Sequence, residues 1–105
     1  MRVYISGPIT NCPGHYRKFL KAERRLKAAG HEVINPAKIG RLLPKSFDCL
    51  DYLDIEYEMI KKCDAIFFLK GWEKSSGACA EHAFASKYEL KMVFEKREVE
   101  LWERK

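Results

Sequence analysis

The segment GWEKSSGACAEHAFA, residues 71–85, holds the side chains whose types and spacing best fit chemistry. Glu81 lies among small residues, one turn into a predicted helix that follows an apolar strand. The helix dipole favours the ionised carboxylate there by about 0.3 to 1 kcal/mol, and the small neighbours leave room for a substrate. An anionic carboxylate in a ligand cleft suits a nucleophile, which makes Glu81 the first candidate for chemistry.

The residues just before this helix are also of types that bind ligands. Ser75, Ser76 and Gly77 combine two hydroxyls with the unpaired amides of a helix N-terminus, a combination that binds phosphate or carboxylate groups. An ordinary serine N-cap would produce the same pattern. We expect Trp72 to lie at the cleft, where its ring would stack on a base or shield a sugar, and packing beneath the loop is the alternative.

A second carboxylate is available from another predicted helix, CLDYLDIEYEMIKKC, over residues 49–63. Its acidic start contains Asp51, Asp54 and Glu56. Acids in first turns commonly cap the helix or face solvent, so the sequence leaves open which of them reaches the cleft. The four cysteines form no CxxC pair, and no histidine stands at zinc-ligand spacing, so we expect no metal and read the cysteines as free thiols.

These residues must be positioned by alternating strands and helices. Hydrophobic periodicity predicts strands over 2–6, 31–36, 64–71 and 91–95, helices over 14–30, 49–63 and 77–89, and one helical turn within 37–48. Such alternation indicates a single doubly wound (Rossmann-like) α/β domain with a parallel sheet of four to five strands. A charged tail over 95–105, compatible with a helix, follows.

In a sheet of this kind, ligands bind beyond the carboxyl ends of the strands. The loops after the first three strands, residues 6–14, 35–40 and 70–77, should therefore meet at one edge. Gly7, Pro8 and Ile9 in the first loop are expected to contact the ligand, although a simple turn at the strand end also explains Gly7 and Pro8. The loop matches neither a Walker A sequence nor GxGxxG, so no nucleotide cofactor is expected.

Composition narrows the class of protein. The chain has 105 residues, enough for one domain, with a net charge of +5. Basic residues alternate with acidic ones rather than forming a stripe, so nucleic acid is not an expected partner. The longest apolar run is far shorter than a membrane span, and the N-terminus lacks the pattern of a signal peptide, so we expect a soluble, cytoplasmic protein.

The stretches VYISGPI and CDAIFFLKGWEKSSGACAEHAFA, with the helix between them, resemble the nucleoside 2-deoxyribosyltransferase-like superfamily over about the first 94 residues. The closest similarity is to its small-protein branch DUF4406, and the superfamily also contains the 2′-deoxynucleoside 5′-phosphate N-hydrolases. The resemblance implies that Glu81 attacks the anomeric carbon and that Tyr4 lies near it. It places Gly7 and Ile9 around the sugar or phosphate and Ser75 on the 5′-phosphate.

The second carboxylate stays open in this comparison. The family usually has an Asp eight residues before the position of Asp64; here Glu56 occupies that register and Asp54 lies two residues earlier. The implied function is cleavage of the N-glycosidic bond, or base transfer, on a deoxynucleoside 5′-monophosphate or related nucleotide, without a cofactor. The alternative is a non-catalytic nucleotide-binding or sensing module on the same fold.

The resemblance also implies a homo-oligomer, because in that family a neighbouring subunit completes the cleft. The surfaces that we expect to be shared are the helix after Asp51 and the tail that contains Trp102.

Overall fold

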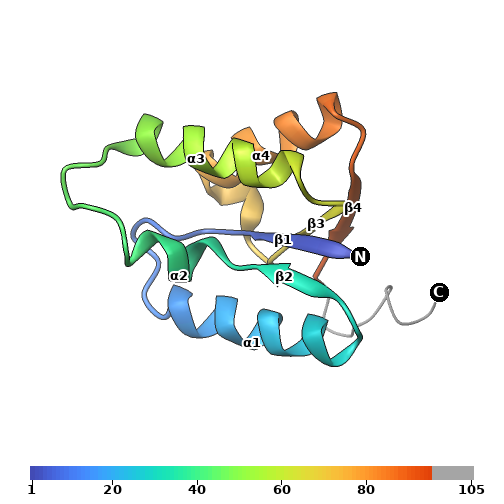
Figure 1. Cartoon of the computed structure of the whole chain (residues 1–105). Coiled ribbons are helices and arrows are strands. Elements are labelled where there is room, and N and C mark those ends of the chain that lie inside the picture. Colours follow the sequence, from blue (N-terminus) through green and yellow to red (C-terminus); the bar gives the residue numbers. More distant parts are fainter. Residues whose placement is uncertain (96–105) are drawn as a thin grey trace.

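Four parallel strands separated by helices form the centre of the molecule in the computed structural model, which describes residues 1–95 (Figure 1). The strands are β1 (Arg2–Ser6), β2 (Glu32–Ile34), β3 (Ala65–Phe68) and β4 (Lys91–Phe94). The helices are α1 (His15–Ala28), α2 (Pro36–Gly40), α3 (Cys49–Lys61) and α4 (Ser76–Lys87), with a short 3-10 turn η1 (Trp72–Lys74) before α4. The predicted doubly wound α/β fold is confirmed.

Local sequence accounts for where these elements begin and end. All four residues of β3 are buried, as the continuous apolar run predicted for a strand covered on both faces. The helical turn expected within 37–48 is α2, but it begins earlier, at Pro36. The sequence favoured Pro36 as the end of a strand; it also suits the first position of a helix, and the Asn35 side chain caps that helix through the amide of Ala37.

Helices cover both faces of the sheet, with α1 and α2 on one side and α3 and α4 on the other (Figure 1). Alternate residues of β1 explain the two cores, because successive side chains on a strand point to opposite faces. The core on the α1 side contains Val3, Ile5, Phe19, Ala22, Leu26, Phe67 and Val93. The core on the α3–α4 side contains Tyr4, Ile60, Cys63, Ile66, Phe68 and Ala85.

A buried carboxylate joins α1 to the start of α2. Glu23 accepts a hydrogen bond from the Asn35 side chain at 3.0 Å, and the ammonium groups of Lys27 and Lys38 lie 2.9 and 3.1 Å from its oxygens. Burial by itself raises the pKa of Glu23, but the hydrogen bonds from Lys27, Asn35 and Lys38 outweigh it and hold the pKa at about 2. Glu23 therefore remains ionised and ties the second loop to α1.

The strand order, β2-β1-β3-β4, creates a switch point between β1 and β3. From β1 the chain moves outward to β2, and it then returns to pair β3 with the other side of β1. The loops after β1 and β3 therefore lead to helices on opposite faces of the sheet, α1 and α4. In doubly wound folds, ligands bind at this carboxyl edge. Among residues 1–95, no helix is long and apolar enough to cross a membrane. The predicted tail, including Trp102, lies outside the described residues, except for Glu95.

Candidate active site

Glu81 is held at the switch point by two hydroxyls from β1. It is 5% exposed and projects from the second turn of α4. The phenol of Tyr4 donates to its Oε2 at 2.8 Å, and the hydroxyl of Ser6 donates to its Oε1 at 2.6 Å. Tyr4 and Ser6 share one face of β1 because they are two residues apart on a strand. Strand and helix together thus present a buried carboxylate with a donor on each oxygen.

Glu56 brings a second carboxyl group from α3 to the same place. Burial, followed by a hydrogen bond to Glu81 and repulsion by the charge of Glu81, raises the pKa of Glu56 to about 9. Two like charges in one desolvated site cannot both ionise readily, so one carboxyl group retains a proton near neutral pH. The Glu56–Glu81 pair therefore combines a proton donor with a carboxylate.

Two tyrosines near the pair remain protonated. Burial, followed by the charges of Glu81 and Glu56, raises the pKa of Tyr4 well above its ordinary value. The same causes, in the same order, raise the pKa of Tyr57 on α3, whose ring stacks on Phe84 of α4 with centroids 4.2 Å apart. The stacked rings hold α3 against α4, and the tyrosine phenols stay available as hydrogen-bond donors.

The other acids at the start of α3 lie elsewhere. Asp51 completes a capping box, since its side chain accepts from the amide of Asp48 at 2.9 Å while that of Asp48 accepts from the amide of Asp51. Asp54 is exposed. Residues two positions apart on a helix are rotated by about 200° around its axis. Asp54 and Glu56 therefore face nearly opposite sides of α3. The structure thus brings Glu56, and not Asp54, to Glu81.

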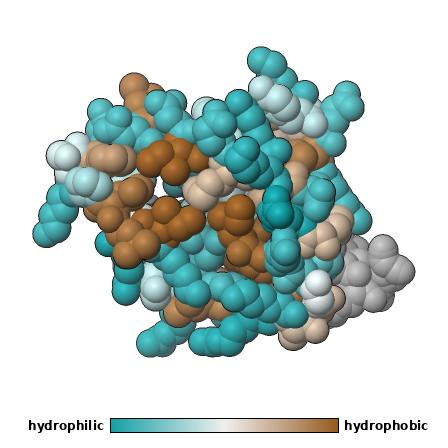
Figure 2. Space-filling model, viewed as in Figure 1, coloured by the Kyte–Doolittle hydropathy of each residue, from teal (hydrophilic) through white to brown (hydrophobic). Residues whose placement is uncertain are grey.

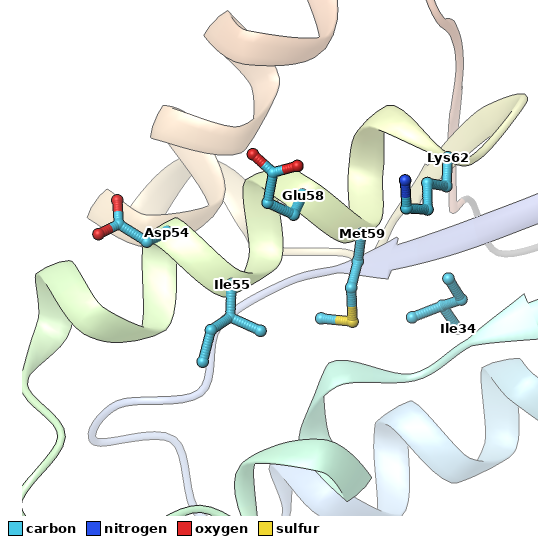
Figure 3. Close-up of a pocket in the computed structure, with 6 residues that line it drawn as sticks. All are labelled: Ile34, Asp54, Ile55, Glu58, Met59 and Lys62. Carbon is cyan, nitrogen blue, oxygen red and sulfur yellow. The ribbon is translucent and has the colours of Figure 1, made fainter.

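Asp54 instead borders an open hollow between α3 and the end of β2 (Figure 3). Ile55 and Met59 extend from α3 toward Ile34, whereas Asp54 and Glu58 point away from the hollow. The hollow encloses about 470 Å³, and Lys62 completes its lining. The hollow and the side chain of Glu56 lie on different sides of α3. The surface of the hollow is mainly apolar.

The first loop combines structural roles with nearness to the site. Gly7 is buried, and a Cβ atom on it would lie 2.9 Å from the Cβ of Leu69, so its lack of a side chain lets the loops after β1 and β3 pack together. A Cβ on Gly71 would be 3.9 Å from Pro8, which brings the same two loops into contact. Ile9 packs against the core on the α1 side. Their contacts with a ligand stay predictions.

The segment before α4 also has structural contacts. Ser75 is the N-cap of α4, and its hydroxyl accepts from the amide of Ala78 at 3.1 Å. Ser76 and Gly77 form the first turn of α4. The ordinary capping pattern is therefore present, and binding of a phosphate at this helix start stays a prediction.

Trp72 is half-buried and makes contacts within the protein. Its ring stacks on His82 with centroids 4.7 Å apart and an angle of 11° between the planes. It also contacts Phe68 and Phe94. These contacts correspond to packing beneath the loop, the alternative considered for this residue. Contact between Trp72 and a ligand stays a prediction.

Ser6 is the site residue that the sequence reasoning missed. It is buried and contacts Glu81 directly. The available signal was the alternation along β1, which puts a polar residue on the same face as Tyr4 at the carboxyl end of a buried strand. Residues 1–95 contain no group of three or more His, Cys, Asp or Glu side chains that could hold a metal ion.

Comparison with known proteins supports one part of the resemblance. The model of the family described as a domain of unknown function, DUF4406, matches residues 1–94. No curated protein matches the chain. The link to nucleoside deoxyribosyltransferases therefore remains a hypothesis, whereas the family match covers all four strands and every residue of the carboxylate site. The chain belongs to the DUF4406 family.

Proposed function

We propose that the protein cleaves the N-glycosidic bond of a deoxynucleoside 5′-monophosphate or related nucleotide, with Glu81 as the nucleophile and Glu56 as the general acid. The observation that carries the proposal is that the carboxyl group of Glu56 lies beside the buried, doubly hydrogen-bonded carboxyl group of Glu81. Glu81 accepts two short hydrogen bonds in a buried site, while burial and Glu81 raise the pKa of Glu56 to about 9. One nucleophilic carboxylate and one carboxylic acid are what a retaining glycoside reaction requires.

The reaction runs in two steps. In the first, an oxygen of Glu81 attacks the anomeric carbon, the bond from this carbon to the base nitrogen breaks, and the proton of Glu56 passes to the departing base. In the second, the Glu56 carboxylate takes a proton from water, the water oxygen attacks the anomeric carbon, and the ester to Glu81 breaks. A second base in place of water would turn hydrolysis into transfer.

The contact between the two glutamates must open when substrate binds. The carboxyl groups of retaining pairs stand about 5 to 5.5 Å apart, farther than hydrogen-bonded groups. Here Glu56 lies close enough to Glu81 for the interaction between the two carboxyl groups to raise the pKa of Glu56. Glu56 is only half-buried, and α3 follows a long loop after α2. A small movement of the Glu56 side chain therefore admits a sugar above Glu81. Tyr4 and Ser6, both on the sheet, hold Glu81 in place meanwhile.

The test is release of free base from a panel of nucleosides and 5′-monophosphates, followed by chromatography. Glu81→Gln keeps the size of the side chain but removes the attacking charge, so base release should fall by about 1,000-fold or more. Glu32→Gln is the matched control, because Glu32 is an exposed acid of β2, paired with Arg2 and outside both the carboxylate site and α3. A slow substrate should leave a sugar covalently attached to the wild-type chain and not to Glu81→Gln.

Two results would contradict the proposal. Turnover of a folded Glu81→Gln protein at the wild-type rate would exclude Glu81 as the nucleophile. Absence of base release from every nucleotide, together with measurable nucleotide binding, would favour the non-catalytic binding module. In that case Glu81→Gln should only weaken binding, by about 1 to 3 kcal/mol for one lost charged hydrogen bond.

We further propose that the protein forms a homo-oligomer through the outer stripe of α3. The stripe consists of Leu50, Asp54, Ile55, Glu58, Met59 and Lys62. Leu50 is 69% exposed, and Figure 2 shows apolar surface gathered across the face that contains α3 and α2. Acids lie toward the start of the stripe and a lysine at its end, so two antiparallel copies would place Lys62 opposite Asp54 of the other copy.

A further inference from the structure

Ser6 has a buried hydroxyl whose position is set by the sheet. It is the last residue of β1, is 1% exposed, and pairs in register with Phe68 of β3. Its carbonyl oxygen accepts from the amide of Leu69 at 2.8 Å, so the backbone is anchored on the β3 side. Its hydroxyl donates to Oε1 of Glu81 at 2.6 Å, a length typical of a hydrogen bond to a charged oxygen.

We propose that Ser6 is a positioning residue for Glu81, an inference that rests on the function proposed above. A carboxylate with a donor on only one oxygen can still turn about its terminal bond, since rotation there is soft. With Tyr4 on Oε2 and Ser6 on Oε1, both oxygens are tied to one rigid strand. The plane of the carboxylate is thereby fixed before substrate arrives, as catalysis by a positioned nucleophile requires.

The two hydroxyls differ in what else they do. Tyr4 fills the core on the α3–α4 side with a large ring, so its loss would disturb packing as well as the hydrogen bond. Ser6 is small, and its hydroxyl contacts Glu81. A change at Ser6 therefore tests the hydrogen bond with little change of volume. Because Ser6 is 1% exposed and its hydroxyl is bonded to Glu81, its loss should slow the chemical step rather than weaken substrate binding.

The experiment compares Ser6→Ala, Ser6→Cys and Ser6→Thr with the wild type. Cys keeps the volume but is a weak donor, whereas Thr keeps the hydroxyl and suits a strand. We expect Ala and Cys to lower kcat for base release about 10- to 100-fold, the loss typical of one hydrogen bond to a charged group, with KM changed less than about 3-fold. Thr should restore most of the rate.

Ile5→Val is the matched control, because Ile5 is buried on the same strand but faces the core on the α1 side. It should lower stability without a comparable loss of kcat. A second readout does not depend on turnover: the carboxyl ¹³C resonance of Glu81, assigned by its absence in Glu81→Gln. This resonance should shift in Ser6→Ala and Ser6→Cys, and it should stay near the wild-type position in Ser6→Thr and Ile5→Val.

Wild-type kcat in Ser6→Cys would overturn the inference, because volume rather than the hydroxyl would then be what matters. An unchanged Glu81 resonance in Ser6→Ala would overturn it as well. If Ser6→Thr fails to fold, the comparison of Cys with Ala and wild type still decides. Failure of the proposed function looks different: the wild type would release no base, which removes the catalytic role of Ser6, while the resonance would still report whether Ser6 holds Glu81.

Discussion

Replacing Glu56 by Gln should make the protein more stable at neutral pH, whatever its substrate. Burial, and then Glu81, raise the pKa of Glu56 from 4.5 to about 9. A carboxyl group with a raised pKa stabilises the fold fully below the pKa of the unfolded chain, and this stability is lost as pH rises toward the folded pKa. The loss arises because Glu56 ionises freely in the unfolded chain. In the folded chain it must either keep its proton or move its charge away from Glu81.

The size of the effect follows from the interval between pH 4.5 and the working pH. Each pH unit in that interval costs about 1.4 kcal/mol for one group, so the ceiling at pH 7 is about 3.5 kcal/mol. Glu56 is only half-buried, and solvent screens part of its interaction with Glu81, so a measured gain of about 1 to 3 kcal/mol is expected. The Gln amide is neutral and can donate to Glu81, so it keeps the hydrogen bond without the ionisation.

Urea unfolding of the wild type and of Glu56→Gln from pH 4.5 to 9 measures this difference directly. The two free energies of unfolding should agree near pH 4.5 and separate as pH rises, with the variant the more stable. Glu32→Gln, at an exposed acid of β2, should follow the wild type within about 0.5 kcal/mol at each pH. A Glu56→Gln curve parallel to that of the wild type, or below it at pH 8, would refute the close pairing of the two glutamates.

Three further results are expected. Gly7→Ala should destabilise the fold by about 1 to 3 kcal/mol in urea unfolding, because the new methyl meets Leu69 at 2.9 Å. Gly77→Ala should be neutral or stabilising, because its methyl would lie at an ordinary contact distance of 3.9 Å from the Ser75 hydroxyl within a helix. Equal losses in both variants would count against the packing reason. Glu23→Gln should lower the free energy of unfolding by about 1 to 2 kcal/mol at pH 7. Because the pKa of Glu23 is lowered to about 2, the difference from the wild type should vanish as pH falls from about 4.5 through 2. A difference that persists at pH 2 would exclude an ionic origin. Leu50→Lys should weaken self-association in sedimentation at tens of micromolar, an order-of-magnitude range for specific binding, and a monomeric wild type would contradict the proposed oligomer.

Much of the architecture could be predicted from periodicity alone. The apolar run that ends at Leu69 indicated a strand covered on both faces, because apolar residues at every position can only be satisfied by two packed layers. Alternation of strands with helices then required parallel pairing and placed the loops after β1 and β3 at one edge. Glu81 was identified from its small neighbours and its place near a helix start, and the structure places it at that edge.

What the sequence left open was decided by contacts between residues far apart in the chain. The start of α3 offered several acids, and only the rotation of this packed helix against α4 turned Glu56 toward Glu81 and Asp54 outward. In the sequence, Ser6 is only the last residue of a strand. Its role depends on the contact between β1 and α4, because its hydrogen bond to Glu81 joins residues 75 positions apart. Local patterns determine which elements form, because backbone geometry repeats over a few residues. Which side chains meet depends on helix rotation and strand order, and these are set by the packing of the whole core.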